Sequence, residues 1–314
     1  MEYRNIGSSD LKVSTLGLGC NNFGRRLDVE GSKQVIAKAL DTGITLFDTA
    51  DSYPLGRFGL SEEIIGESLG VRRKDIVLAT KFGYPVDDPD IKPNGSHAYI
   101  TSAVEGSLKR LKTDWIDLYF YHKPDPNTPL EETVRALDDL IRTGKVRHVG
   151  CSNFSAALVN DSLRIARELG AHAFICAQEQ YSLLARDIEK EVIPALAAHG
   201  LGLIPFFPLA SGMLTGKYRK GQPAPEGSRL AKVKPLADRF LTERNLDAGE
   251  RLARFAGSRG HRLIDLAFCW LLARKPVASV IAGASTPGQV EDNLRALGAW
   301  QLSKEDIAEV ELLT

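Results

Sequence analysis

The sequence has few cysteines, no excess of charge of either sign and no long apolar run. The four cysteines lie too far apart for the closely spaced pairs of a zinc site, and they do not suggest a disulfide framework. The 40 basic residues balance the 40 acidic ones, so no overall field favours nucleic acid or an anionic membrane. No apolar run approaches the roughly 18 residues that span a bilayer. These absences predict a small molecule as the partner, with no nucleic acid and no membrane.

Other signals are missing as well. The first residues lack the basic and then apolar pattern of a secretory signal, which predicts a cytoplasmic protein. No two of the six histidines have His-x-His or His-x-x-x-His spacing, so no metal is expected. The Gly-x-Ser-x-Gly motif of serine hydrolases is also missing, because its nearest counterpart, GCSNF, ends in Phe154.

The chain does contain eight short apolar runs. Each is nearly continuous in its hydrophobicity, which is typical of parallel strands that are covered on both faces. They lie at residues 15–20, 44–48, 75–81, 115–122, 146–153, 173–178, 201–207 and 279–284. Segments with helical periodicity lie between them, among them 32–43, 102–114, 130–144 and 188–200. Eight such alternations predict a (β/α)8 barrel.

The alternative to the barrel is an open, doubly wound sheet. That fold carries a Gly-x-Gly-x-x-Gly turn after its first strand. Gly17 and Gly19 fit this turn, but Asn22 stands where the third glycine belongs. We also expect an N-terminal β-hairpin over residues 2–14 and a long βα loop over residues 208–239. No linker divides the chain, so residues 1–314 are predicted to form a single domain.

Polar side chains stand at the ends of neighbouring predicted strands, where barrels carry their catalytic groups. Asp48, Lys81 and His122 each end a strand, and Tyr53 follows Asp48 in the next loop. Each residue alone would also fit a helix cap, a solvated side chain or a half-buried side chain. The four together predict a site in which the Lys81 ammonium lowers the pKa of the Tyr53 phenol and Asp48 balances the charge of Lys81. With His122 orienting a substrate oxygen, this set could protonate a carbonyl, while hydride must come from elsewhere.

With these residues in place, the sequence resembles the aldo-keto reductase family along nearly its whole length. The matching stretches are FDTADSY, LSEEIIGESL, YHKPDP, GKVRHVGCSNF, PLASGMLTGKY, PEGSR and STPGQVEDN. The resemblance implies a (β/α)8 barrel and a catalytic tetrad of Asp48, Tyr53, Lys81 and His122, with Tyr53 as the general acid. It also implies an NAD(P)H-dependent oxidoreductase that reduces aldehydes or ketones, with sugars and related hydroxylated carbonyls among the candidate substrates.

The resemblance further implies where a nicotinamide cofactor binds. Ser152 and Asn153, assisted by Gln178, would hold the nicotinamide carboxamide, Phe206 would stack on the ring, and residues 208–217 would wrap the pyrophosphate. The full implied set is Gly19, Cys20, Asn21, Asp48, Ser152, Asn153, Gln178, Phe206, Pro208, Leu209, Ser211, Gly212, Leu214, Gly216, Lys217, Gly283, Ser285, Gln289, Asp292 and Asn293.

Two stretches depart from the family pattern. The loop at residues 283–293, where the family often gathers basic residues around the 2′-phosphate of NADP, has no lysine or arginine. NADP(H) is therefore expected on the resemblance alone, and NAD(H) stays open. The insertion SYPLGRFG, residues 52–59, could reshape the substrate mouth. The first loops supply the candidate substrate residues Asn22, Phe23, Tyr84 and His97.

Two other functions stay open from the sequence. An NAD-linked aldose or alcohol dehydrogenase would use the same site in the oxidative direction. A non-catalytic, cofactor-binding regulatory subunit would use the barrel without turnover, as some similar barrels do in ion channels. The sequence makes no prediction about oligomeric state.

Overall fold

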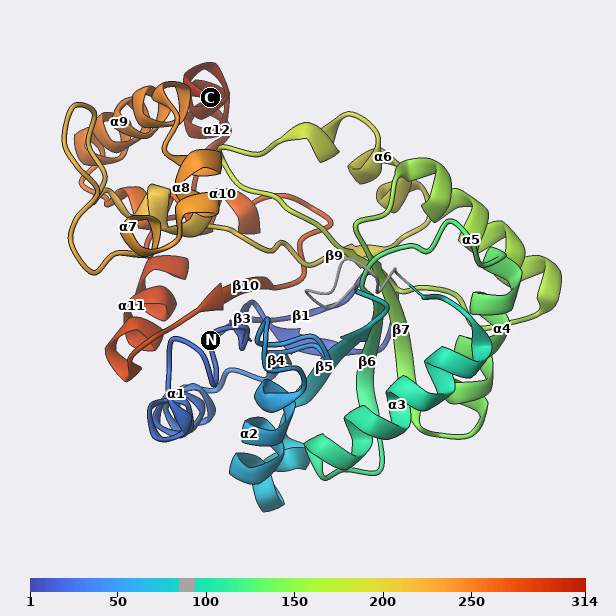
Figure 1. The fold of residues 1–314 in the computed structure, drawn as a ribbon. Coiled ribbons are helices and arrows are strands. Elements are labelled where there is room, and N and C mark those ends of the chain that lie inside the picture. The colour runs from blue at the N-terminus through green and yellow to red at the C-terminus, as the bar shows by residue number, and fades with distance from the viewer. Residues whose placement is uncertain (85–93) are drawn as a thin grey trace.

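Eight parallel strands form the centre of the molecule (Figure 1). The computed structural model describes residues 1–84 and 94–314. The strands lie in the order β10-β3-β4-β5-β6-β7-β8-β9. Their bounds are β3 (Leu16–Gly19), β4 (Leu46–Asp48), β5 (Val77–Phe82), β6 (Ile116–Tyr121), β7 (Val146–Ser152), β8 (Cys176–Gln178), β9 (Gly202–Leu203) and β10 (Val280–Gly283). All eight strands predicted from the apolar runs are therefore present in the predicted order.

The two ends of this strand order, β9 and β10, are linked by backbone hydrogen bonds. Leu203 N–H donates to Pro276 O at 2.6 Å, and Ala278 N–H donates to Leu203 O at 3.0 Å. Farther along, Ile281 N–H donates to Pro205 O at 3.2 Å. These bonds close the sheet into a barrel, which confirms the predicted (β/α)8 barrel class.

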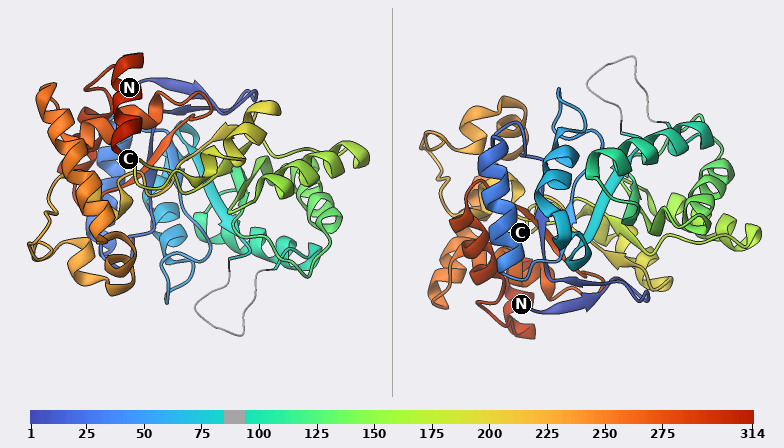
Figure 2. Two further views of the ribbon diagram at one scale, coloured as in Figure 1. Left: turned by 90° about the horizontal axis from the view of Figure 1, so that it is seen from above. Right: turned by 90° about the horizontal axis from the view of Figure 1, so that it is seen from below.

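Helices lie outside the strands, as both views in Figure 2 show. Six of them occupy the first two thirds of the chain: α1 (Val29–Asp41), α2 (Leu60–Leu69), α3 (His97–Leu111), α4 (Leu130–Arg142), α5 (Ala156–Leu169) and α6 (Val192–Ala198). Those that follow are α7 (Arg229–Lys232), α8 (Lys234–Phe240), α9 (Glu243–Ser258), α10 (Leu263–Leu272), α11 (Pro287–Leu297) and α12 (Lys304–Leu313). Several start at a serine or threonine whose hydroxyl accepts a backbone N–H, as at Ser155 before α5.

Alternate residues along each strand point to opposite faces, and this alternation separates two cores. Leu46, Ala79 and Leu118 belong to a cluster inside the ring of strands. Their neighbours Phe47 and Tyr119 belong to the larger cluster that packs against the helices. Because both faces are covered, both sets are apolar, which explains why the strands read as continuous runs.

The N-terminal hairpin covers one end of the strands. Its strands β1 (Tyr3–Asn5) and β2 (Lys12–Ser14) pair antiparallel, as predicted. Ile6 and Val13 are fully buried and belong to the cluster inside the barrel. Gly7, at φ +57°, approaches β9 so closely that a Cβ would lie 2.5 Å from the backbone N of Gly202, so only glycine fits there.

Two parts of the chain differ in detail from the prediction. The segment after β9, expected as a loop over residues 208–239, contains a 3-10 turn at Ala210–Thr215 and the short helices α7 and α8. Helix α3 begins at His97, five residues before the predicted start, because Ser96 caps it by accepting the N–H of Tyr99. In the described part of the chain, no helix is both long and apolar enough to cross a membrane.

Candidate active site

The predicted catalytic residues lie at one end of the barrel, opposite the hairpin. Asp48 follows Leu46 by two residues on β4, and Lys81 follows Ala79 by two residues on β5. Their side chains therefore point to the same inward face as those of Leu46 and Ala79. His122 follows β6, and its N–H donates to Phe82 O at 2.9 Å. Strand pairing thus brings the three side chains to one rim, as parallel strands in register must.

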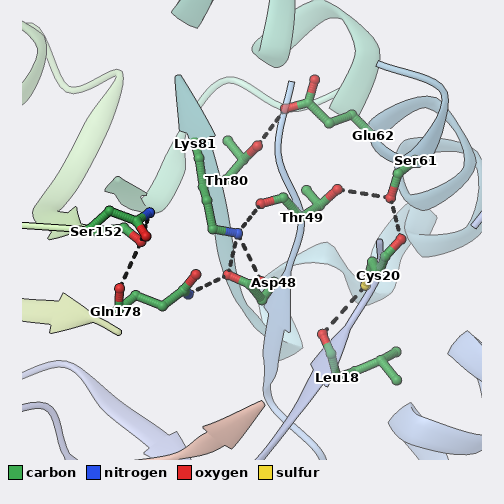
Figure 3. Close-up of polar contacts among 11 residues, drawn as sticks. Leu18, Cys20, Asp48, Thr49, Ser61, Glu62, Thr80, Lys81, Ser152 and Gln178 are labelled. Atoms are coloured by element: carbon green, nitrogen blue, oxygen red, sulfur yellow. Dashed lines mark hydrogen bonds and ion pairs between the residues drawn. The ribbon is translucent and has the colours of Figure 1, made fainter. Parts of the chain in front are cut away.

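Lys81 forms the most buried charged contact in this rim. Its side chain is fully buried, and its Nζ donates to both carboxylate oxygens of Asp48 at 2.8 Å and to Thr49 O at 2.6 Å. Gln178 Nε2 donates to Asp48 Oδ1 at 2.8 Å from the other side. Figure 3 shows the ammonium and the carboxylate facing each other from adjacent strands, with Gln178 beyond them. All three protons of the ammonium are therefore used, which holds the charge in a fixed place.

Three rings gather above this ion pair. The Tyr53 ring centroid lies 5.0 Å from Lys81 Nζ and 5.8 Å from the His122 ring, in an edge-to-face arrangement. The Tyr84 ring lies 4.8 Å from His122 on another side. The four residues predicted as a tetrad are therefore neighbours in space, and Tyr84 borders them.

The expected effect of Lys81 on the pKa of Tyr53 is not found. Burial raises the pKa of the Tyr53 phenol well above its usual range, and the negative charge of Asp48 adds to the increase. Burial is the main cause, and the carboxylate of Asp48, which pairs with Lys81 at 2.8 Å, offsets the charge of the ammonium. The protein alone therefore keeps Tyr53 protonated.

His122 is held in its neutral form. Burial lowers the pKa of His122 well below its usual range, and the nearby charge of Lys81 lowers it further. Its Nδ1 is buried without a hydrogen-bond partner among the described residues. A neutral imidazole carries one N–H, so His122 can donate a hydrogen bond to a ligand oxygen without bringing a charge. Together with the protonated phenol of Tyr53, whose ring lies 5.8 Å from that of His122, this places two uncharged donors side by side, as carbonyl protonation requires.

The residues implied for the nicotinamide stand beside the tetrad. Asn153 has a left-handed backbone, φ 60°, and its Nδ2 donates to His122 O at 2.9 Å. Ser152 Oγ donates to the backbone O of Gln178 at 2.7 Å. The Gln178 side chain, expected to assist at the carboxamide, donates its amide to Asp48 instead. Cys20 N–H donates to Asp48 O at 2.9 Å, which brings the end of β3 to the same place.

The segment implied for the pyrophosphate has a strained backbone. Phe207, Ala210 and Ser211 have positive φ values of 54°, 46° and 58°, and Gly212 has φ 100°. Successive residues in such conformations can turn backbone N–H groups toward one anion. The Ser211 Oγ is buried and has no partner among the described residues, and Lys217 Nζ lies 3.7 Å from the position that a Cβ on Gly212 would take. These groups fit a phosphate-bearing cofactor.

The loop at residues 283–293 offers polar but uncharged contacts. Ser285 N–H donates to Gln289 Oε1 at 2.8 Å, and Asn293 Nδ2 lies 3.5 Å from Gly283 O. Asp292 is the charged residue of this loop in the implied cofactor set. It forms ion pairs with Arg262 at 3.2 Å and with Arg295 at 3.1 Å. The guanidinium groups nearest this loop are thus already neutralised. Two more implied residues lie near the end of β3: Gly19 ends the strand and pairs in register with Gly283, and Asn21 follows in the next turn. The Phe206 ring packs edge-to-face on Phe207 at 5.5 Å, and Pro208, Leu209, Leu214 and Gly216 lie in and around the turn Ala210–Thr215.

The structure places only some of the expected substrate residues near the tetrad. Tyr84 borders His122, and Asn22 lies against Gly283, where a Cβ would be 3.3 Å from the Asn22 Nδ2. Phe23 is fully buried in the core cluster, so the expectation that it lines an open pocket is wrong. His97 is also misplaced, because it starts α3 and its Nε2 contacts Asp139 of α4 at 3.1 Å. The insertion at residues 52–59 exposes Leu55 and Phe58 next to Tyr53.

Several groups around the site were missed in the sequence. The Glu179 carboxylate accepts the N–H of Phe154 at 3.0 Å behind Asn153, and burial raises its pKa to about 7. The Asp51 pKa is also raised to about 7, first by burial and then by Glu62. No motif marks either acid, because each acts through contacts with distant elements: Glu62, for example, is bound by Thr80 at 2.6 Å and Arg110 at 2.7 Å.

Comparison with known proteins identifies the family. The model of the aldo/keto reductase family matches residues 15–313. A probable voltage-gated potassium channel subunit beta from Oryza sativa subsp. japonica is 38% identical over 98% of this chain and 95% of its own. L-glyceraldehyde 3-phosphate reductase from Escherichia coli (strain K12) is 35% identical over 99% and 92%. An uncharacterized oxidoreductase from Bacillus subtilis (strain 168) is 37% identical over 95% and 91%.

The family match covers nearly all of the chain, and the barrel with its buried lysine at the rim agrees with it. The fold, the oxidoreductase class and the use of a nicotinamide cofactor follow from this membership. The chain belongs to the aldo/keto reductase family.

Proposed function

We propose that this protein reduces aldehydes or ketones with NADPH and that Tyr53 delivers the proton to the carbonyl oxygen. The observation that carries the proposal is the position of Lys81. Its ammonium is fully buried, fixed by Asp48 and Thr49, and 5.0 Å from the Tyr53 ring. Nothing in a barrel core requires a buried ion pair, and burying one is costly. Its place under a buried phenol favours a catalytic role.

Each residue of the tetrad has a distinct task in this proposal. The bound nicotinamide supplies hydride to the carbonyl carbon. Tyr53 and neutral His122 hydrogen-bond the carbonyl oxygen and orient it, and Tyr53 gives up its proton as negative charge develops there. Lys81 and Asp48 form a pair of opposite charges beneath the phenol, and Asp48 keeps Lys81 in position. A raised phenol pKa suits this order, because the developing alkoxide is a stronger base than a phenolate.

For the substrate we propose a small hydroxylated carbonyl, such as a short sugar. A relative named L-glyceraldehyde 3-phosphate reductase supports this class. We also propose that residues 1–314 act as one domain, supported by the single run of eight strands. A cytoplasmic location is proposed as well, because all four cysteines are free and buried, which fits a reducing compartment.

The decisive experiment compares the wild-type protein with Tyr53→Phe. We expect reduction of a panel of aldehydes, ketones and sugars to fall by about 10²- to 10⁴-fold in the variant. NADPH affinity, measured by fluorescence titration without substrate, should stay within about twofold, since the hydroxyl acts on the substrate. Turnover retained by Tyr53→Phe would rule out the assignment of the proton donor.

A second candidate function is supported by the relatives. Two proteins that are 38% and 39% identical carry the name of a probable voltage-gated potassium channel subunit beta. A subunit of this kind would bind the cofactor tightly and turn over negligibly. The complete tetrad favours catalysis, and steady-state turnover on the same substrate panel distinguishes the two. An NAD-linked dehydrogenase, the other alternative, would instead show faster alcohol oxidation with NAD than carbonyl reduction with NADPH.

A further inference from the structure

The first turn of α2 lies beside the tetrad. Ser61 and Glu62 are the second and third residues of this helix, and both are fully buried. Polar side chains at the start of a helix usually accept the free backbone N–H groups of that helix. Helix α2 has no such side-chain cap, because Gly59 occupies the capping position. The two polar side chains instead face the ends of the strands (Figure 3).

The Ser61 hydroxyl joins two segments that hold the catalytic ion pair. Ser61 Oγ donates to Cys20 O at 2.9 Å and lies 2.9 Å from Thr49 Oγ1. A hydroxyl has one proton, so the Thr49 hydroxyl must be the donor in the second bond. Beyond the first partner, Cys20 N–H donates to Asp48 O at 2.9 Å. Beyond the second partner, Thr49 O accepts a hydrogen bond from Lys81 Nζ at 2.6 Å.

The backbone of Ser61 also holds the segment that carries the phenol. Ser61 N–H donates to Tyr53 O at 3.2 Å. This bond joins the start of α2 to the beginning of the loop that precedes it. Ser61 is therefore linked to three of the four tetrad residues: to Tyr53 directly, and to Asp48 and Lys81 through one residue each.

Glu62 fixes this turn of the helix against the strand that carries Lys81. Glu62 Oε1 accepts the Thr80 hydroxyl at 2.6 Å, and Glu62 Oε2 accepts Arg110 Nε at 2.7 Å. Thr80 precedes Lys81 on β5, and Arg110 lies on α3. A buried carboxylate that loses a partner is strongly destabilised. The Ser61 hydroxyl is thus held at a fixed distance from the strand ends.

We propose that Ser61 is a positioning residue of the reaction. Its hydroxyl and its N–H hold the segments of Asp48, Thr49 and Tyr53 at the spacing that places the ammonium of Lys81 under the phenol. This inference rests on the proposed function for the reaction itself. Because Ser61 is fully buried, it acts through these neighbours and not on the substrate. A displacement of reacting groups by about 1 Å can cost about 100-fold in rate, so its loss should appear in kcat.

Steady-state kinetics of Ser61→Ala and Ser14→Ala test the proposal, with NADPH and the best substrate of the panel described above. Ser14 is the matched control, because it is also fully buried and its hydroxyl donates to a backbone carbonyl, Leu16 O, at 2.6 Å. Both variants should lose stability, since each removes a buried hydrogen bond. Only Ser61→Ala should lower kcat, by about 10- to 100-fold. KM and NADPH affinity should stay within about threefold.

A second variant tests the route through Thr49. Thr49→Val keeps the shape of the side chain and removes the hydroxyl that bonds to Ser61. It should lower kcat, and the double variant Ser61→Ala/Thr49→Val should have the same kcat as Ser61→Ala, because both single changes break the same bond. Effects that multiply would overturn this route. Thr49→Val also carries the test if Ser61→Ala does not fold.

Proton exchange of the Lys81 ammonium gives a readout that needs no turnover. It is followed by NMR on protein labelled with nitrogen-15 lysine, without substrate. Exchange should be about tenfold faster in Ser61→Ala than in the wild type, and unchanged in Ser14→Ala. Unchanged exchange in Ser61→Ala, or an equal loss of kcat in both serine variants, would leave Ser61 with a structural role only and overturn the proposal. Faster exchange in a protein whose wild type reduces no carbonyl would reject the proposed function alone.

Discussion

The two halves of the candidate site are built on different principles. Around Lys81, every donor of the ammonium has a partner, and Asp48 accepts bonds from two side chains. Around Lys217, the backbone is strained, the Ser211 hydroxyl lacks a partner among the described residues, and the ammonium forms no ion pair with a carboxylate of those residues. The half around Lys81 is fully hydrogen-bonded within the protein, whereas the half around Lys217 keeps a polar group without a partner among the described residues. Substitutions should therefore reduce stability in the first half and binding in the second.

The largest effect is expected for Lys81→Met. It leaves Asp48 buried with Gln178 as its remaining side-chain partner, and breaking a buried pair in this way costs about 3–5 kcal/mol. Carbonyl reduction should also be lost. Chemical denaturation measures the stability and a turnover assay the activity. Lys74→Met, at an exposed lysine, is the control. A fully stable Lys81→Met protein would break the contrast between the two halves.

Gln178→Leu should have the next largest effect. The change removes the bond from Nε2 to Asp48 but keeps the backbone carbonyl that Ser152 uses. Losing one charged hydrogen bond should cost about 1.5–3 kcal/mol of unfolding free energy. The midpoint of urea denaturation measures it, with Gln222→Leu at an exposed position as the control. An unchanged midpoint would mean that Lys81 alone holds the carboxylate.

Lys217→Gln should show the opposite pattern. This lysine is exposed and pairs with no carboxylate in the described residues, so its removal should leave the unfolding temperature unchanged. Affinity for NADPH and NADH should fall by about tenfold, because both carry the pyrophosphate. Fluorescence titration measures the affinities. A destabilised variant with normal cofactor affinity would reverse the assignment of the two halves.

The last prediction concerns the pH dependence of stability at Asp51, an effect that appears only as the pH is raised. Its pKa is raised to about 7, above its value of about 4 in the unfolded chain. The folded state therefore binds more protons between these values, so stability is full below about pH 4 and declines as the pH rises through 7. Asp51→Asn should remove this decline. Compared with the wild type, the variant should gain about 2–3 kcal/mol at pH 8 relative to pH 5. If the unfolding free energies of the wild type and Asp51→Asn changed in parallel with pH, Asp51 would not be the group that causes the decline.

The same division explains what the sequence could predict. The strands and the tetrad were predictable because continuous apolar runs mark parallel strands, and parallel strands end at one rim. Phe23 was expected at the pocket because it lies in the first loop, but its side chain turns into the core, and side chains in loops follow no sequence period. The predicted direction of the Tyr53 pKa shift was wrong, because a sequence shows which charges exist but shows neither the burial of the phenol nor the pairing of Lys81 with Asp48.

The hairpin at the other end of the barrel has a consequence for this chemistry. Ile6 and Val13 fill the base of the barrel, under the residues that support Lys81. A chain without its first fourteen residues would keep all eight parallel strands, but water could then enter from beneath. The local dielectric constant would rise, and the attraction between the ammonium and its carboxylate would weaken. The amino-terminal segment thus shields the buried ion pair from water at the closed end of the barrel.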